Sequence, residues 1–167
     1  EDSAFYLQVW SHRLGQPLAS DRYETGKDLP RIAEIQLATE PRNGGVLATV
    51  QYGDSGRFAF YVRRPAGGDW LQVAGFDDGI SQMTWMDKDT LLLVARHGSP
   101  RGRVQTLSLA APALANAKTI IAETADTIVS DFLPPSPVVV TPNRIYLRYQ
   151  LGGPTDVRAF DHSGKPL

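Results

Sequence analysis

Residues 80–121 read ISQMTWMDKDTLLLVARHGSPRGRVQTLSLAAPALANAKTII. Runs rich in Val, Ile, Leu and Thr alternate here with turn-forming Gly, Pro, Asp and Asn, which is typical of short strands joined by tight turns. The alanine-rich part, Leu109–Ala117, is interrupted by Pro112 and does not predict a helix. The four predicted strands are Ile80–Met86, Thr90–Arg96, Arg103–Ser108 and Lys118–Ile121.

The same pattern recurs on both sides of this stretch. Ile32, Ile80 and Ile128 open the segments IAEIQL, ISQMTW and IVSDFL, so consecutive segments begin 48 residues apart. A repeat of about fifty residues with four strands is close to the length of a β-propeller blade. The other predicted strands are Phe5–Ser11, Ile32–Ala38, Val46–Tyr52, Phe58–Arg63, Trp70–Val73, Ile128–Leu133, Arg144–Gln150 and Asp156–Asp161.

Two predicted strands do not alternate between apolar and polar residues. Val46–Val50 and Leu91–Ala95 carry no charged residue, which indicates strands covered on both faces, as in stacked blades. A β-sandwich would use similar strands, but the 48-residue recurrence favours a propeller. We therefore expect an all-β, partial β-propeller of about three four-stranded antiparallel blades plus part of another. The expected units are a partial blade and connector at 1–31, blades at 32–75 and 76–124, and a blade truncated at its last strand at 125–167.

Composition excludes several classes of site. The 167 residues carry a net charge of −1 and no cysteine, so neither a basic nucleic-acid footprint nor a thiolate metal site is expected. No apolar run approaches the roughly 20 residues that span a bilayer. We expect no cofactor, and both the bacterial cytoplasm and the periplasm stay open as compartments. The start at Glu1 and the turn-like end SGKPL suggest a piece of a longer protein.

No catalytic or metal-binding residue is assigned. The three histidines, His12, His97 and His162, fall on different predicted blades, so a shared metal site is not expected. Asp161, His162 and Ser163 are the residue types of a serine-hydrolase triad, but sequence neighbours in a turn cannot adopt the triad geometry.

One basic group is a weak candidate for substrate contact. Arg96, His97, Arg101 and Arg103 surround one predicted turn and could face a tunnel or a peptide carboxylate. The alternative is a solvated turn in which arginine stems cover apolar surface. Trp10 and Trp70 are expected to pack between blades, because aromatic burial contributes strongly to a core.

Several motifs resemble the propeller of the prolyl oligopeptidase family. The segment HRLGQPLASD, residues 12–21, is similar to the family's His-x-Leu-Gly-Thr … Asp connector, although Gln16-Pro17 replaces the threonine. Residues 98–104, GSPRGRV, and 117–123, AKTIIAE, resemble a turn and an outer strand of the family. Residues 156–164, DVRAFDHSG, are similar to a later hairpin. These motifs occur in the family's order along nearly the whole chain.

The resemblance implies a function for which this chain is only one part. It implies a propeller that limits entry of short peptides to an α/β-hydrolase domain of the same parent chain, a serine peptidase. The nucleophile motif Gly-x-Ser-x-Gly is absent from the sequence, so no triad residue is carried over. A non-enzymatic module that binds a protein or a glycan is the alternative. Because unclosed blades expose edges and apolar faces, we also expect the isolated chain to self-associate.

Overall fold

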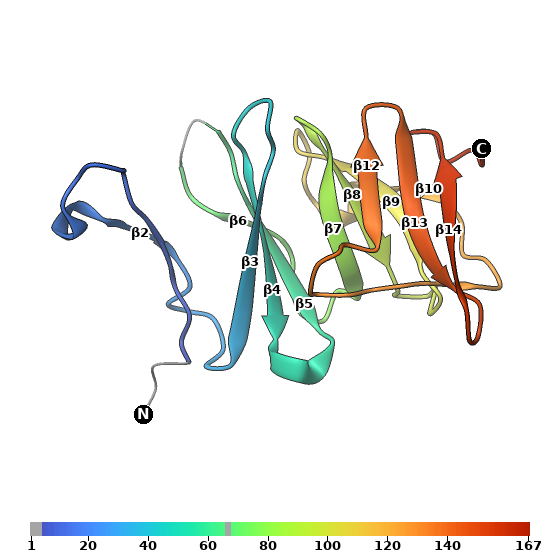
Figure 1. The fold of residues 1–167 in the computed structure, drawn as a ribbon, viewed down its shortest axis with the longest axis horizontal. Coiled ribbons are helices and arrows are strands. Elements are labelled where there is room, and N and C mark those ends of the chain that lie inside the picture. The colour runs from blue at the N-terminus through green and yellow to red at the C-terminus, as the bar shows by residue number, and fades with distance from the viewer. Residues whose placement is uncertain (1–4, 66–67) are drawn as a thin grey trace.

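The computed structural model describes residues 5–65 and 68–167, which form strands, turns and three single-turn 3-10 helices. A two-stranded ribbon is followed by three four-stranded antiparallel sheets, which we name blade 1, blade 2 and blade 3 (Figure 1). The ribbon contains β1 (Val9–Ser11) and β2 (Arg22–Thr25). The 3-10 turns are η1 (Leu18–Ser20), η2 (Gly53–Ser55) and η3 (Leu114–Asn116). None of these helical turns is long enough to cross a membrane.

Each blade is made from consecutive strands. Blade 1 contains β3 (Ala33–Thr39), β4 (Val46–Tyr52), β5 (Phe58–Arg63) and β6 (Leu71–Ala74). Blade 2 contains β7 (Ile80–Asp87), β8 (Thr90–Ala95), β9 (Arg103–Ser108) and β10 (Lys118–Ile121). Blade 3 contains β11 (Thr127–Ile128), β12 (Val138–Thr141), β13 (Arg144–Gln150) and β14 (Thr155–Phe160).

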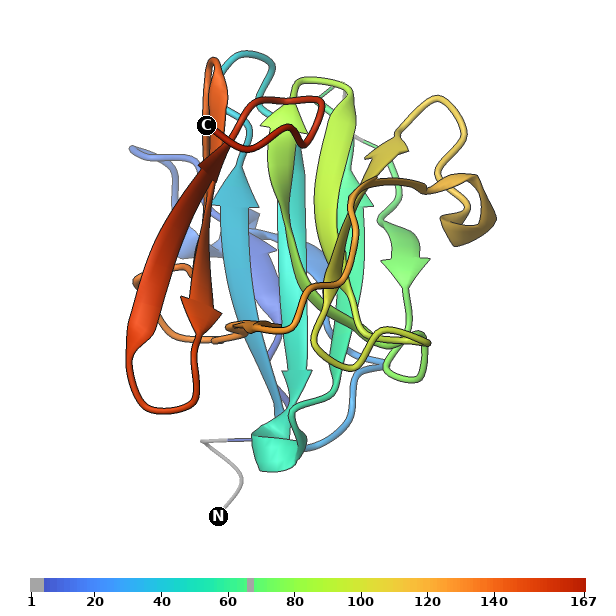
Figure 2. The same ribbon diagram turned by 90° about the vertical axis from the view of Figure 1, so that its right-hand side faces the viewer.

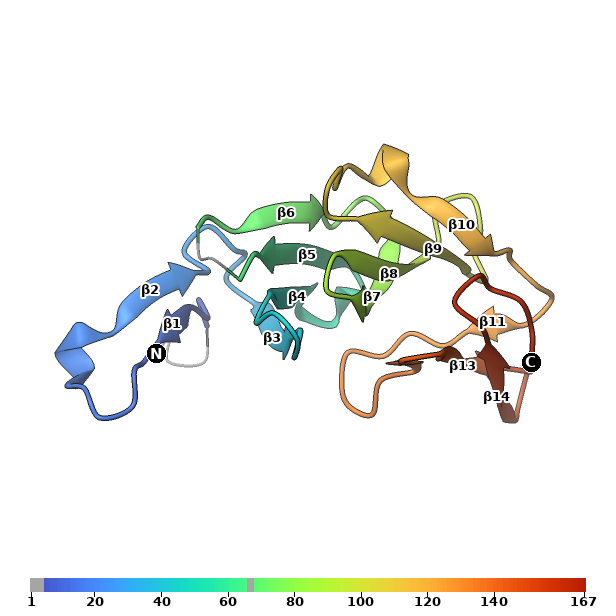
Figure 3. The same cartoon turned by 90° about the horizontal axis from the view of Figure 1, so that it is seen from above.

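The blades stand side by side along an arc. Seen from above, the first strands β3 and β7 lie on its concave side and the last strands β6 and β10 on its convex side (Figure 3). Blades 1 and 2 have the sequential orders β3-β4-β5-β6 and β7-β8-β9-β10, as in a propeller blade. The predicted all-β class and the partial propeller are thus confirmed. None of the sheets in the described residues closes on itself.

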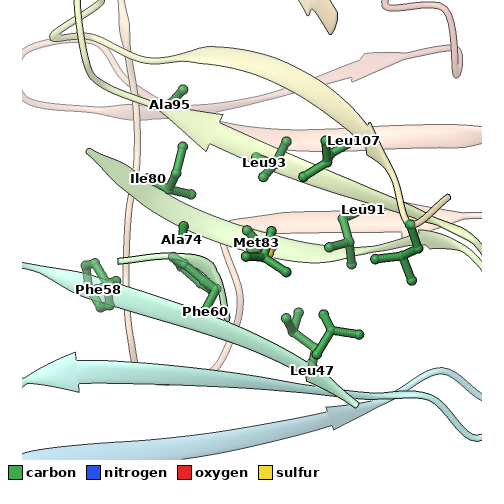
Figure 4. Close-up of a cluster of buried hydrophobic side chains, with 13 residues drawn as sticks. Leu47, Phe58, Phe60, Ala74, Ile80, Met83, Leu91, Leu93, Ala95 and Leu107 are labelled. Atoms are coloured by element: carbon green, nitrogen blue, oxygen red, sulfur yellow. The ribbon is translucent and has the colours of Figure 1, made fainter. Parts of the chain in front are cut away.

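The position of β8 between two blade interfaces explains why Leu91–Ala95 is apolar throughout. Leu91 and Leu93 belong to a cluster buried between blades 1 and 2, in which Phe60 and Met83 also lie (Figure 4). Leu92 and Val94 belong to a second buried cluster, between blades 2 and 3. Because alternate residues of a strand point to opposite faces, one run of five apolar residues supplies both interfaces.

The first strand of blade 3 differs from the prediction. A continuous strand Ile128–Leu133 was expected, but β11 ends at Ile128 and the chain returns to the same edge of β13 only at Val138. Pro134, Pro135 and Pro137 lack the N–H that a strand donates to its ladder. The proline-rich segment therefore forms a loop between β11 and β12, which pair one after the other with the same edge of β13.

The N-terminal ribbon also corrects two expectations. The strand expected at Phe5–Ser11 is shorter, and it pairs with β2, which the sequence pattern did not predict. Trp10 is 53% exposed on this ribbon and packs edge-on against Tyr23 instead of lying between blades. Trp85 fills that role, because it packs against the cluster between blades 1 and 2 and its indole N–H donates to Ala38 O at 3.2 Å.

The sequence also predicts a turn at Pro65–Asp69, but residues 66 and 67 of it lie outside the described residues. Trp70, which follows it, is half-buried, and the Arg63 guanidinium lies 5.7 Å from the centre of its ring. Arg63 belongs to the same blade, and the packing of Trp70 between blades stays a prediction.

The turn between β3 and β4 is built on a buried carboxylate. Burial raises the pKa of Glu40, but the Arg42 side chain and the backbone N–H groups of Arg42 and Asn43 donate hydrogen bonds to it and hold its pKa below the ordinary value of 4.5. The side chain of Glu40 has no exposed surface. The charged form of this residue therefore stabilises the turn.

The Glu40→Gln variant is expected to lose part of the pH dependence of stability. A carboxyl with a lowered pKa in the folded state contributes stability above its ordinary pKa of 4.5 and loses it as the pH falls through the lowered value. Urea unfolding between pH 7 and pH 3 should show a shallower decline for the variant than for the wild type, together with a lower stability at pH 7. Parallel curves would contradict this role for Glu40.

Candidate functional site

A hollow opens between blades 1 and 2, beside the proline-rich segment of blade 3. Its volume is about 680 Å³, which is the size of a small-molecule or short-peptide site. Blade 1 supplies its wall from β3, from η2 and from the start of β5. Blade 2 supplies the start of β7 and Arg96, the residue that follows β8. Residues 130–133 close the third side.

Three aromatic side chains line this pocket. Phe58, Phe76 and Phe132 line it, and the rings of Phe58 and Phe132 are 6.3 Å apart between centres. Charged groups surround them: Arg57 pairs with Asp77 at 2.5 Å, and Glu34 lies on the same wall. A lining that combines aromatic side chains with charges of both signs suits a short peptide better than a uniformly charged ligand.

Arg96 is a half-buried cation that lines the pocket. Its Nε donates to Ser81 Oγ at 3.2 Å, its Nη1 to Pro100 O at 2.9 Å, and its Nη2 to Ser130 Oγ at 2.8 Å and to Ile128 O. Burial lowers the pKa of Arg96, and the more distant Glu123 opposes this effect. Arg96 donates four hydrogen bonds to uncharged groups and thereby connects the end of blade 2's strand β8 to the start of the proline-rich segment.

The other predicted basic residues lie away from this pocket. Arg103 Nη1 donates to His97 O at 2.8 Å and to Ser99 Oγ at 2.9 Å, which fixes the turn after β8. The Arg101 backbone N–H donates to Glu123, and the side chains of His97 and Arg101 are exposed. Of the four residues, Arg96 alone is among the pocket-lining residues, and substrate contact by any of the four stays a prediction.

Two of the three histidines, His12 and His162, make structural contacts. His12 Nδ1 and Asp21 Oδ1 lie 2.6 Å apart and close the loop between β1 and β2. His162 Nε2 contacts Thr141 O at 2.9 Å, while Ser163 Oγ donates to Asp161 at 2.6 Å. His162 therefore does not bridge Ser163 and Asp161 as a triad histidine would.

The sequence did not point to the pocket's other walls. Ser81, Ser130, Phe58 and Phe132 belong to no motif, and they meet only because three blades converge. The one available signal was the proline-rich run after Ile128, which cannot continue a strand. Among residues 5–65 and 68–167, no group of three or more metal-ligating side chains is close enough to hold a metal ion.

Solved structures with the same fold identify the architecture. The chain matches a structure from a study of two prolyl endopeptidases with a TM-score of 0.82 and 22% identity, over 99% of this chain and 23% of that one. It matches prolyl oligopeptidase B from Galerina marginata with a TM-score of 0.77 and 11% identity, over 100% and 23%. Oligopeptidase B from Leishmania major follows with 0.73 and 12%, over 92% and 21%.

The matches cover nearly the whole of this chain but only a small part of each solved structure. No protein-family model and no curated protein sequence matches the chain. The chain spans less than a quarter of the length of the solved structures above, and nearly all of it aligns. The resemblance inferred from the sequence motifs is therefore confirmed at the level of structure, and the chain has the fold of a segment of the prolyl oligopeptidases.

Proposed function

We propose that this chain is the propeller portion of a prolyl-oligopeptidase-like serine peptidase and that it controls the access of short peptides to a catalytic domain of the same protein. The observation that carries the proposal is the alignment of 99% of the chain, at a TM-score of 0.82, with 23% of a prolyl endopeptidase. The chain itself contains no Gly-x-Ser-x-Gly. Cleavage would therefore depend on residues of an α/β-hydrolase domain outside residues 1–167.

The inter-blade pocket supports a role in peptide selection. A proline ring or another compact apolar side chain would pack against Phe58 and Phe76, while Glu34 and Arg57 would attract the amino and carboxyl groups of a short peptide. The expected role is selection and positioning, with no bond broken by this chain.

The test uses the full-length protein encoded by the reading frame that contains this chain. A fluorophosphonate probe should label one serine outside residues 1–167, and a Gly-Pro anilide should be hydrolysed faster than a Gly-Gly anilide. The Phe58→Ala variant should raise KM by about tenfold with little change in kcat, since it removes apolar binding rather than a reacting group. A matched Leu71→Ala change on an outer strand should leave both constants unchanged.

Two results would overturn the proposal. A reading frame that ends near Leu167, or a full-length protein with no labelled serine, would indicate instead a non-enzymatic module that binds a protein or a glycan. Equal hydrolysis of a short peptide and of a folded protein would contradict control of access, even if the serine is labelled.

A further inference from the structure

The proline-rich segment of blade 3 reaches past the neighbouring blade. We name residues 129–137 the strap. It leaves blade 3 after β11, runs beside β7 of blade 2 and places Phe132 against Phe58 of blade 1 before it returns as β12 (Figures 1 and 2). The strap, which connects β11 to β12, thus contacts all three blades.

Both ends of the strap are firmly held. At its start, the Val129 N–H donates to Arg148 O at 2.8 Å, and Ser130 Oγ contacts both Arg96 Nη2 and Ser81 Oγ at 2.8 Å. At its end, the Arg148 N–H donates to Pro137 O at 2.9 Å. These contacts fix where the strap leaves and rejoins the sheet.

The middle of the strap is held by much less. The contacts of its tip include the Phe132 ring, which packs on Phe58 at the edge of the cluster between blades 1 and 2, and the hydrogen bond from Gln82 Nε2 to Asp131 O at 2.5 Å. Arg148 of blade 3 also pairs with the Asp131 carboxylate, at 3.4 Å. Leu133 is 64% exposed, and the residues 134–136 that follow it are exposed as well. A segment with few buried contacts opens at a lower free energy than the sheets that carry it.

The tip also separates two hollows. The pocket of about 680 Å³ and a smaller one of about 180 Å³ share the lining residues Phe58, Asp131, Phe132 and Leu133. The smaller hollow lies over β3 and β7, where Leu37 and Met83 line it. Moving Phe132 away from Phe58 would join the two into one groove between the first strands of blades 1 and 2.

We propose that the strap is a lid whose tip swings on its fixed ends and opens this groove on the concave side of the arc. The closed position is the one in the structure, with Phe132 seated on Phe58. The open position would admit a longer apolar segment than the pocket alone accepts. This device is a property of the chain and does not depend on peptidase activity.

Thiol reactivity tests the lid, because the chain has no native cysteine. Met83 is 6% exposed beneath the strap, and Leu93 is buried in the same inter-blade cluster without lining either hollow. The thiol of Met83→Cys should react with DTNB at least about tenfold faster than that of Leu93→Cys, because lid opening exposes only the first. Adding Phe132→Ala should accelerate Met83→Cys further and leave Leu93→Cys unchanged.

Two patterns would contradict the lid. Equal rates for the two thiols would mean that exposure requires opening of the whole inter-blade interface. An equal acceleration of both by Phe132→Ala would mean that this change loosens the blades rather than the strap.

A measurement on the unmodified protein guards against effects of the cysteines themselves. Thermolysin should cut before Phe132 or Leu133 at a rate that does not change in dilute urea, because local opening exposes little surface. Cleavage in the strap only at urea concentrations that unfold the sheets would overturn the proposal.

Discussion

The Phe60→Ala variant is expected to lose about 3–5 kcal/mol of unfolding free energy, the usual cost of removing a fully buried aromatic ring. Phe60 has no exposed surface and lies in the cluster between blades 1 and 2, where Leu47 and Met83 also pack (Figure 4). Propeller blades are held to their neighbours mainly by such interfaces. The cavity would therefore weaken both blades at once, and urea unfolding followed by circular dichroism would measure the loss.

Leu71→Ala is the matched control for this change. Leu71 is 41% exposed on β6, the outer strand of the same blade, so its truncation should cost less than about 1 kcal/mol. Equal losses for the two variants would mean that the interface between blades 1 and 2 is not the main source of stability.

The Gly164→Ala variant is expected to lose about 3–4 kcal/mol, through backbone strain and a steric clash together. Gly164 has a φ of +89°, and a Cβ at this position would lie 2.0 Å from Ile120 O of β10. The turn that contains Gly164 is closed by its own N–H, which donates to Asp161 O at 3.0 Å. This turn cannot move away from Ile120 without losing its contact with blade 2. Thermal unfolding would measure the loss of stability.

Gly152→Ala separates the two contributions. Gly152 has a similar φ of +86°, but a Cβ there would meet no atom within 4 Å. Only the backbone strain of about 1–2 kcal/mol should remain. If Gly164→Ala were no worse than Gly152→Ala, the close contact between the last turn and β10 would be contradicted.

Much of the architecture could be predicted from local pattern. The strands Val46–Tyr52, Phe58–Arg63, Arg103–Ser108, Lys118–Ile121 and Arg144–Gln150 have the bounds that the sequence predicts. Alternation, β-branched residues and turn-forming glycines are local signals. The equal spacing of Ile32, Ile80 and Ile128 added the repeat, so the class and the number of blades followed without any contact being known.

The failures share a physical cause. Strand β2 (Arg22–Thr25) carries three charged or polar residues and forms only because β1 offers it an edge. Trp10 has a large aromatic side chain of the kind that is usually buried, but its position on the ribbon leaves it exposed. In both cases the neighbour across the strand determines the outcome, and strand propensity depends on that neighbour.

The pocket also depends partly on local sequence and partly on tertiary packing. The sequence by itself determined the strand order, the apolar runs and the prolines that prevent residues 134–137 from forming a strand, because these follow from each residue's own backbone and burial preferences. Only the tertiary structure brought Phe132 of blade 3 onto Phe58 of blade 1, and Arg96 of blade 2 onto Ser130. These partners are 34 or more positions apart, and their contact depends on how the blades stack, which no local pattern encodes.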